Sequence, residues 1–455
     1  MRKSILAVAV AAATVVSGAN AAGFYLKEQS VVGQGRAFAG SAAGTDGASA
    51  AYFNPAGIVG LERQVEVGVH YIKPMAEVTD QGTTAAAAGT TTIPTSPIDS
   101  TNFNALGLGT AVTMDQQNPY SGKAIPNLHF IQPLDDHTAA SIYVGAPFGF
   151  GNKYNEDYFG QYDSIKNELS VIEISGSLAK RVSDTLKVAF SLNYQSLDVE
   201  QSAMAAPGFT STLKGTASEV GYVLSFQKTL GQSILGFSHR SETTHDVTGT
   251  QTFFNKTTGA QSAVGTTGPV VNATATFGLP AITALGIAHE VSDQTRVYGD
   301  VTYYGWSNYE RGNVTASDST GGLPTGTIFN PAVNNYTDTV SLAIGIEHDY
   351  GNGLTVRSGA HYDPTPTNDT DRATSTPDGD RLWLAGGFTK EVTEALMFDA
   401  ALTYILVDDG AVDRSTTKAL ARNSSGVPTQ TLTINTKAKS EGNVGILSLG
   451  LRYKF

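Results

Sequence analysis

Apolar and polar residues alternate along many short segments of the chain. Between residues 186 and 195, Leu, Val, Phe, Leu and Tyr are separated by Lys, Ala, Ser, Asn and Gln, and residues 65–71 and 219–227 follow the same pattern apart from Val223. Successive side chains of a β-strand point to opposite faces, so this period of two predicts strands with one apolar face. Alternation alone does not separate a membrane barrel from a soluble β-sandwich, because both contain such strands.

Fourteen such segments can be placed, and their connections fall into two classes. Connections after even-numbered strands are tight, whereas those after odd-numbered strands, such as residues 74–123, 312–335 and 408–440, are long and polar. Short periplasmic turns, long outer loops and an even strand count are typical of outer-membrane barrels. We therefore predict an all-β fold, a 14-stranded antiparallel transmembrane β-barrel over residues 64–455. The predicted strands are 64–73, 124–132, 138–148, 168–180, 185–199, 216–228, 233–248, 271–290, 295–311, 336–348, 354–363, 380–389, 396–407 and 441–455.

The first residues indicate export from the cytoplasm. Arg2 and Lys3 precede an apolar run over residues 5–16, and the small-x-small site for cleavage is Ala19-Asn20-Ala21. This arrangement is typical of a secretory signal peptide, which we predict to span residues 1–21. The apolar run is shorter than the roughly 20 residues that a membrane-spanning helix needs. Together with the barrel pattern, it predicts a protein of the bacterial cell outer membrane.

Composition narrows the possible functions. The chain has 455 residues and no cysteine, which excludes disulfides and thiol-ligated metals. Only 15% of its residues are charged, and a net charge of −12 argues against nucleic acid as a partner. We find no Gly-x-Ser-x-Gly elbow, phosphate-binding loop or His-Glu-x-x-His motif. The sequence therefore predicts no enzyme, no cofactor and no metal site.

Residues 22–63 precede the first predicted strand and do not alternate. They are rich in Gly and Ala, which permit close approach of one backbone to another, and they include apolar Phe24, Leu26, Phe38 and Phe53. A flexible periplasmic tail would leave these side chains in water. We therefore expect residues 22–63 to form a hatch that plugs the lumen, a known arrangement in membrane barrels.

Several short motifs occur in order along the whole mature chain: Ala22-Gly23-Phe24-Tyr25-Leu26, residues 33–40, Asn54-Pro55-Ala56, residues 125–130, Gly305-Trp306-Ser307 and residues 377–383. Together they resemble the FadL-type (FadL/TodX) long-chain fatty acid transporters. The resemblance implies a monomeric barrel with an N-terminal hatch. It also implies that the barrel binds long-chain fatty acids or similar hydrophobic compounds and releases them sideways into the outer-membrane lipid.

The third predicted strand contains residues that weaken a strand. Pro147 cannot donate a hydrogen bond to a neighbouring strand, and Gly145, Gly149 and Gly151 tolerate a bend or bulge. In the FadL family a kink in the third strand forms the lateral opening, and this stretch aligns with it. The alternative is that Pro147 only marks the end of the strand. Pro280 interrupts a later strand in a similar way.

Five residues are candidate ligand contacts. Asn127 and His129 alternate with apolar neighbours and should therefore face the lumen, where His129 could meet a fatty-acid carboxylate or simply form part of a polar wall. The apolar candidates are Phe24 in the hatch and Phe148 and Phe150 in the third strand.

Other residues are candidates for structural roles. Asp378, Asp380 and Arg381 follow a long loop and could pin it by a charge-assisted pair. The hatch motif Asn54-Pro55-Ala56 predicts a rigid turn, for which the resemblance suggests a gating role. The terminal aromatic Phe455 ends a closing strand of the kind that barrel-assembly machinery reads, or it belongs to the aromatic girdle.

Several functions remain open from the sequence. Uptake of long-chain fatty acids leads, and uptake of aromatic hydrocarbons by the same fold is its nearest rival; a general porin and a surface adhesin are the alternatives of other classes. The outer loops near 200–215 and 249–270 are short. In fatty acid members of the family these loops form an outer capture groove, so the sequence puts that groove in doubt here.

Overall fold

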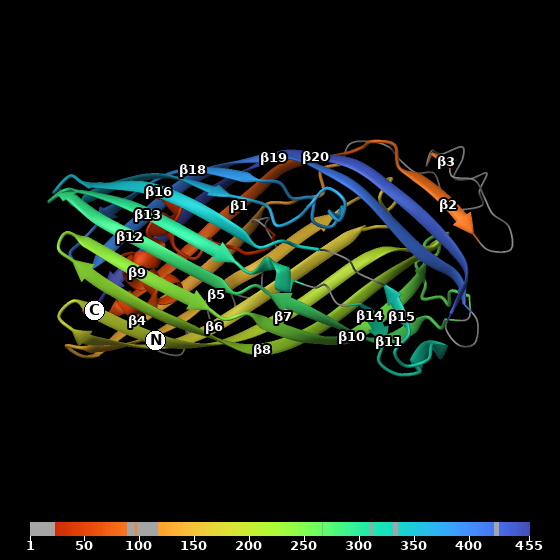
Figure 1. Ribbon diagram of the computed structural model, residues 1–455, viewed down its shortest axis with the longest axis horizontal. Coiled ribbons are helices and arrows are strands. Elements are labelled where there is room, and N and C mark those ends of the chain that lie inside the picture. Colours follow the sequence, from red (N-terminus) through yellow and green to blue (C-terminus); the bar gives the residue numbers. More distant parts are fainter. Residues whose placement is uncertain are drawn as a thin grey trace.

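The computed structural model describes residues 23–88, 96–97, 117–265, 267–309, 313–330, 335–422 and 427–455, so the predicted signal peptide lies outside it. The chain forms a closed antiparallel barrel whose last strand, β20 (Pro428–Lys454), pairs with its first, β1 (Gln64–Asp80) (Figure 1). The barrel has 14 transmembrane strands, as predicted. In order around it, the others that run unbroken are β4 (Lys123–Asp135), β5 (Thr138–Lys153), β6 (Lys166–Ser183), β7 (Leu186–Ala206), β8 (Phe209–Leu230), β13 (Thr295–Tyr304), β16 (Thr339–Asp349), β17 (Leu354–Asp363), β18 (Arg381–Glu391) and β19 (Leu396–Arg422).

Two transmembrane strands consist of two pieces. The seventh is β9 (Ser233–Arg240) followed by β10 (Thr243–Asn255), and the eighth is β11 (Val270–Leu279) followed by β12 (Ile282–Ser292). The break in the eighth falls at Pro280, where the sequence predicted an interruption. Four short strands lie in the outer connections: β2 (Thr84–Ala88), β3 (Ser96–Pro97), β14 (Val314–Ala316) and β15 (Ile328–Asn330).

The outer parts of the barrel differ from the prediction. Residues 408–440, predicted as a loop, belong mostly to β19 and β20, which curve across the outer end (Figure 1). The connection after β7 has only the two residues 207 and 208, so long loops do not follow every odd-numbered strand. The predicted strand 295–311 ends at Tyr304. The outer parts of β19 and β20 carry polar residues on both faces, because beyond the membrane their outward face no longer contacts lipid. Their pattern of apolar and polar residues therefore resembles that of a loop.

The outward face of the barrel carries an apolar band with an aromatic girdle at its outer edge. The girdle consists of outward-pointing tyrosines on six strands, each 40–51% exposed: Tyr71, Tyr194, Tyr222, Tyr303, Tyr362 and Tyr404. Tyrosine prefers the membrane–water interface because its ring is apolar and its hydroxyl is wet. The girdle therefore marks the outer boundary of the lipid.

Residues 23–63 pack inside the half of the barrel that carries the short turns and the C-terminus (Figure 1). Short helices make up this hatch: α2 (Val31–Gln34), η1 (Ser41–Ala43), η2 (Gly47–Ser49), α3 (Ala50–Phe53) and η3 (Pro55–Ile58). Nearly all of its side chains are buried. No helix among the described residues has the length and apolarity needed to span a membrane.

Glycines in the wall allow the hatch backbone to approach the strands. A Cβ atom on Gly236 of β9 would lie 1.8 Å from the Ala42 carbonyl oxygen, and one on Gly359 of β17 would lie 2.1 Å from that of Arg36. Gly286, Gly345 and Gly387 lie close to the hatch backbone in the same way, whereas Gly68 and Gly450 lie against the Val31 side chain of the hatch. The hatch is thus fitted to the wall from β9 to β1.

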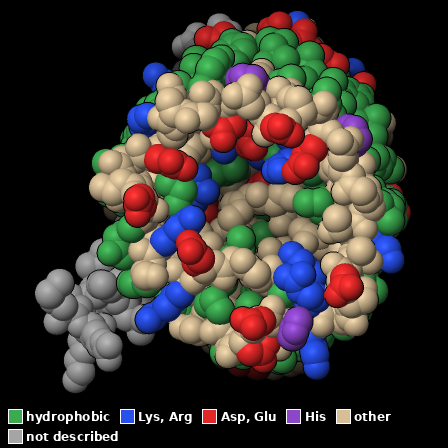
Figure 2. Space-filling view, turned by 90° about the vertical axis from the view of Figure 1, so that its left-hand side faces the viewer, with side chains coloured by type: hydrophobic (Ala, Val, Ile, Leu, Met, Phe, Trp, Pro, Cys, Tyr) green, Lys and Arg blue, Asp and Glu red, His purple; other side chains and the backbone are tan. Residues whose placement is uncertain are grey.

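A chain of charges ties the hatch to the same side of the wall. Arg36 pairs with Asp46 inside the hatch and lies 3.4 Å from Glu347 of β16, which also accepts from Arg357 of β17. The chain continues through Thr389 to Arg452 on β20. Figure 2 views the end with the short turns and shows acidic and basic side chains around a central hollow.

Candidate functional site

The β5 strand leaves one of its two neighbours halfway along. Its pairing with β4 ends at Val144, opposite Leu128, whereas its pairing with β6 continues to Lys153. Between Gly145 and Phe148 the register with β6 shifts by one residue, which is a bulge at the predicted strand-breaking stretch. Residues 123–127 of β4 pair with β1 alone. The barrel ladder is therefore interrupted between β4 and β5.

The start of the hatch occupies the edge of β5 that β4 leaves. The Leu26 N–H donates to the Pro147 carbonyl oxygen (2.8 Å), and the Gly149 N–H donates to the Phe24 carbonyl oxygen (2.9 Å). Tyr25 and Phe148 form an antiparallel bridge between these two bonds. Pro147, which has no N–H to offer, accepts here instead. Residues 24–26 thus take the place of β4 along this part of β5.

Aromatic side chains surround Phe24 at this point. Its ring lies 6.1 Å from Phe148 and 5.9 Å from Phe150, measured between centroids, and 4.9 Å from Trp306 and 4.7 Å from Tyr309. All five side chains are buried. We call them the aromatic slot. The sequence predicted Phe24, Phe148 and Phe150 as ligand contacts. Trp306 occurred there only within one of the family-like motifs, and Tyr309 was not predicted.

Polar side chains with unused hydrogen-bonding atoms lie beside the slot. Asp378 pairs with Arg381 and accepts the Gly23 N–H (3.0 Å). The Nε and Nη1 atoms of Arg381, Oε2 of Glu28 and Nε1 of Trp383 are buried and have no hydrogen-bond partner among the described residues. Burial raises the pKa of Glu28, a hatch residue, to about 7, although the charge of Arg381 acts in the opposite direction. We call Glu28, Asp378, Arg381 and Trp383 the polar cluster. Buried polar atoms normally have partners, so the polar cluster has unused capacity for a further polar group.

Asn127 and His129 face inward, as predicted, and both contact the hatch. His129 Nε2 lies 2.9 Å from the Gln29 carbonyl oxygen, and Asn127 Nδ2 lies 2.9 Å from His70 Nε2 and 3.4 Å from the Glu28 carbonyl oxygen. These contacts hold residues 28 and 29 against β1 and β4. The two side chains are therefore placed to position the hatch beside the polar cluster.

The remaining candidate residues lie at separate places. Asn54 caps the helix η3 by accepting the Ala56 N–H, and its amide donates to the Ala42 and Phe226 carbonyl oxygens, so Asn54-Pro55-Ala56 joins two parts of the hatch to β8. Asp380 accepts from Tyr362 and Thr365, which fixes the start of the connection before β18. Phe455 is exposed at the periplasmic rim, and its N–H donates to the Arg63 carbonyl oxygen.

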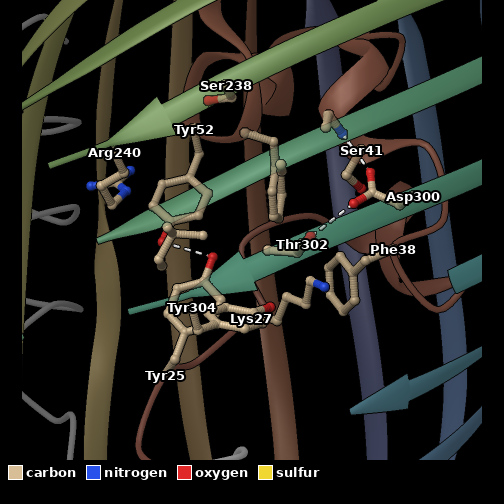
Figure 3. Close-up of a pocket in the computed structure, with 14 residues that line it drawn as sticks. Tyr25, Lys27, Phe38, Ser41, Tyr52, Ser238, Arg240, Asp300, Thr302 and Tyr304 are labelled. Atoms are coloured by element: carbon tan, nitrogen blue, oxygen red, sulfur yellow. Dashed lines mark hydrogen bonds between the residues drawn. The ribbon is translucent and has the colours of Figure 1, made fainter. Parts of the chain in front are cut away.

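A small cavity separates the hatch from the wall on the far side of Tyr25 (Figure 3). Lys27 and Tyr52 line it from the hatch, and Arg240, Asp300 and Tyr304 line it from the strands. Its volume of about 40 Å³ holds water but no acyl chain, because sites for small molecules usually measure about 300–1,000 Å³. A larger ligand has to displace protein atoms, and Phe24 occupies the apolar position beside the interrupted wall.

Two outer connections pack together at the outer end of the lumen. Thr374, in the connection between β17 and β18, donates from its N–H and hydroxyl to Asp163 (2.8 and 2.7 Å) and accepts from the Tyr154 hydroxyl (2.7 Å). Tyr158 and Phe159, from the connection between β5 and β6, are buried with them. We call this arrangement the outer lid.

Comparisons with known proteins agree with this architecture. Residues 12–455 match the family described as "Outer membrane protein transport protein (OMPP1/FadL/TodX)". Outer membrane protein P1 of Haemophilus influenzae is 27% identical, over 100% of this chain and 99% of its own. The long-chain fatty acid transport protein of Escherichia coli strain K12 is 25% identical, over 89% of this chain and 91% of its own.

Solved structures show the same fold. A Pseudomonas aeruginosa FadL homologue has a TM-score of 0.78 at 19% identity, covering 95% of this chain and 100% of its own. The Ralstonia pickettii toluene transporter TbuX has a TM-score of 0.60 at 18% identity, covering 96% and 99%. At these identities the likeness concerns the fold alone.

Proposed function

The chain belongs to the OMPP1/FadL/TodX family of outer-membrane transport proteins, and from this premise we propose that it takes up long-chain fatty acids by binding them in the lumen and releasing them sideways between β4 and β5. The observation that carries the proposal is the interrupted ladder, at which residues 24–26 of the hatch occupy the edge of β5 that β4 leaves. A fatty acid loses about 0.8 kcal/mol of stabilisation for each CH₂ group exposed to water, so a sideways exit into lipid avoids the aqueous periplasm.

The aromatic slot suits the hydrocarbon tail. Its four wall residues, Phe148, Phe150, Trp306 and Tyr309, now bury the Phe24 ring, and an acyl chain would replace that ring with little change in buried apolar surface. Displacing Phe24 also breaks its carbonyl bond with Gly149, which frees the edge of β5. Ligand binding and opening of the wall are thereby coupled through one short segment.

The polar cluster suits the carboxylate. Arg381 has two unused donor atoms, and Asp378 links it to Gly23 at the start of the same segment. Hydrogen bonds to a charged partner contribute about 1.5–3 kcal/mol each. A head group at the polar cluster and a tail in the aromatic slot therefore place a fatty acid along residues 23–26.

Replacing Arg381 by Gln should weaken oleate binding about 10- to 100-fold, because about 1.4 kcal/mol corresponds to a factor of ten in affinity. Toluene, which has no carboxylate, should bind the variant as well as it binds the original protein. Titration of the purified protein with each ligand measures both effects.

The matched control is Lys390→Gln, which removes an exposed positive charge from the same strand. It should leave both affinities unchanged. Equal losses for oleate and toluene in Arg381→Gln, with the barrel still folded, would contradict the assignment of Arg381 to the carboxylate. If the original protein binds toluene and ignores oleate, the aromatic slot serves aromatic hydrocarbons, the second candidate function, and the fatty acid proposal is overturned.

Deleting Pro147 should reduce oleate uptake at least tenfold. The deletion removes the extra residue of the bulge, so that β5 can remain in register with β6 and continue its pairing with β4. Uptake of radiolabelled oleate by cells measures release, and titration of the purified variant should show that binding persists.

Deletion of Leu134 is the control for this experiment, because it removes another irregular residue, at the β4–β5 turn far from the hatch segment. It should leave uptake unchanged. Normal uptake in the Pro147 deletion, with assembly shown by heat-dependent gel mobility, would exclude the lateral route.

A further inference from the structure

A second interruption lies in the wall, between β8 and the seventh transmembrane strand. The pairing of β8 with β9 ends at Val223, opposite Arg240, and its pairing with β10 starts at Thr216, opposite Thr248. Residues 217–222 of β8 therefore face residues 241–247 without a ladder. The neighbouring pairs, β7 with β8 and β10 with β11, remain continuous over this stretch. Among the described residues, two hydrogen bonds join residues 217–222 to residues 241–247, both between Tyr222 and Ser241. A third spans the stretch on its inner face, from the Thr243 hydroxyl to Gln195 of β7.

Side chains rather than backbone bonds fill this stretch. Thr243, His245 and Val247 point inward and are buried. Both ring nitrogens of His245 lack a hydrogen-bond partner among the described residues. Separating β8 from β10 here would break few bonds, and the histidine offers a polar contact on the way.

The inner side of the interruption belongs to the apolar cluster that contains the aromatic slot. Val247 is a member of this cluster with Phe24, Phe148 and Phe150, and Ala217 packs against the cluster. The outer side lies at the membrane boundary. Tyr222 is part of the aromatic girdle, Val220 is 58% exposed beside it, and the outward residues beyond them are the exposed Ser218, Thr244 and Asp246. The interruption thus joins the head-group level of the outer leaflet to the apolar lumen.

A path through the side wall would let a ligand reach the lumen without passing the outer lid. Tyr154, Tyr158 and Phe159 are packed with Thr374 at the outer end of the lumen, where an axial path from outside would begin. The connection between β7 and β8 has only two residues, and the paired residues 209–216 of β8 and 248–255 of β10 separate it from the interruption. A hydrophobic molecule that gathers at the membrane surface meets the side wall there.

We infer that the stretch between residues 217–222 and 241–247 is a lateral entry gate for amphipathic hydrophobic molecules, with a hydrocarbon chain and a small polar head. The chain passes between β8 and β10 into the apolar cluster while the head passes His245. This inference rests on the proposed function, because it supplies the ligand that later leaves between β4 and β5. Entry and exit then lie in different parts of the wall, and the aromatic slot connects them.

The test joins the two strands covalently across the interruption. Extending the register of Thr216 and Thr248 by two residues sets Ser218 opposite Asp246. The chain has no cysteine, so Ser218→Cys with Asp246→Cys can be bridged selectively by a reducible bis-methanethiosulfonate reagent. Bridging should lower uptake of radiolabelled oleate by cells at least fivefold, and reduction should restore it. Equilibrium binding of oleate to the bridged, purified protein should persist, because ligand still exchanges between β4 and β5.

The control is the pair Thr216→Cys with Thr248→Cys, which lies two residues away on the same strands, where the ladder is already formed. Bridging it should leave uptake within twofold of the unbridged protein. Unchanged uptake after bridging residues 218 and 246, in cells whose unbridged protein transports oleate, would overturn the entry gate and leave the proposed function intact. Absence of oleate uptake by the original protein would overturn both.

Discussion

Replacing Gly236 by Val should prevent most of the protein from reaching its folded, heat-modifiable form. The first added atom would lie 1.8 Å from the Ala42 carbonyl oxygen and 2.6 Å from the Ala43 Cα atom. Both are backbone atoms of the hatch, and a backbone cannot relieve the collision by a change of rotamer, as a flexible side chain can. Overpacking of an interior costs typically about 1–3 kcal/mol, and a collision between two backbones lies at the upper end or beyond. Semi-native gel electrophoresis of membrane fractions measures the folded share.

The same substitution at Gly176 is the matched control. Gly176 lies in β6, faces outward, and has open space around the position of an added Cβ atom. Valine is favoured in strands, so Gly176→Val should fold at least as well as the original protein. If Gly236→Val also folds normally, with an unchanged melting temperature, the hatch does not rest on the glycines of the wall.

The barrel could be predicted from the sequence because the bilayer imposes a strict alternation of apolar and polar side chains. Lipid on one side and a polar lumen on the other require alternation along every strand, and Leu186 to Tyr194 show it clearly. The pattern fades where the lipid ends. The outer parts of β19 and β20, within residues 408–440, have polar residues on both faces, so no hydropathy signal distinguished them from a loop.

The candidate site could be predicted where a single residue type has a local consequence. Pro147 cannot donate to a neighbouring strand, and the structure has its bulge there. The segment that pairs with the freed edge, residues 24–26, could not be foreseen, because it does not alternate and lies more than one hundred residues away along the chain. The break after Arg240 was missed for a related reason: Ser241-Glu242 contains no Pro or Gly to mark it, whereas Pro280 marked the break in the next strand.

Glu173→Ala should destabilise the protein by about 3–5 kcal/mol, the usual result of leaving one member of a buried ion pair without its partner. Glu173 accepts from Arg240 at 2.7 and 2.8 Å and from Gln195 at 2.9 Å, and both charged side chains are buried. The Arg240 guanidinium also lies 4.5 Å from the centre of the Tyr52 ring. A lower melting temperature, followed by the loss of heat-dependent gel mobility, measures the effect.

This pair also connects the two interrupted parts of the wall. Glu173 stands opposite Gly145 at the start of the β5 bulge, and Arg240 is the last residue of β9 before the β8–β10 interruption. Glu173→Leu with Arg240→Met removes both charges and should regain most of the lost stability, because apolar residues of similar volume can replace a buried pair at little cost. If the double variant is as unstable as Glu173→Ala alone, the loss comes from the packing around Glu173 and not from the unpaired charge. If it is stable and still transports oleate, the two charges hold the wall together and take no part in carrying the ligand.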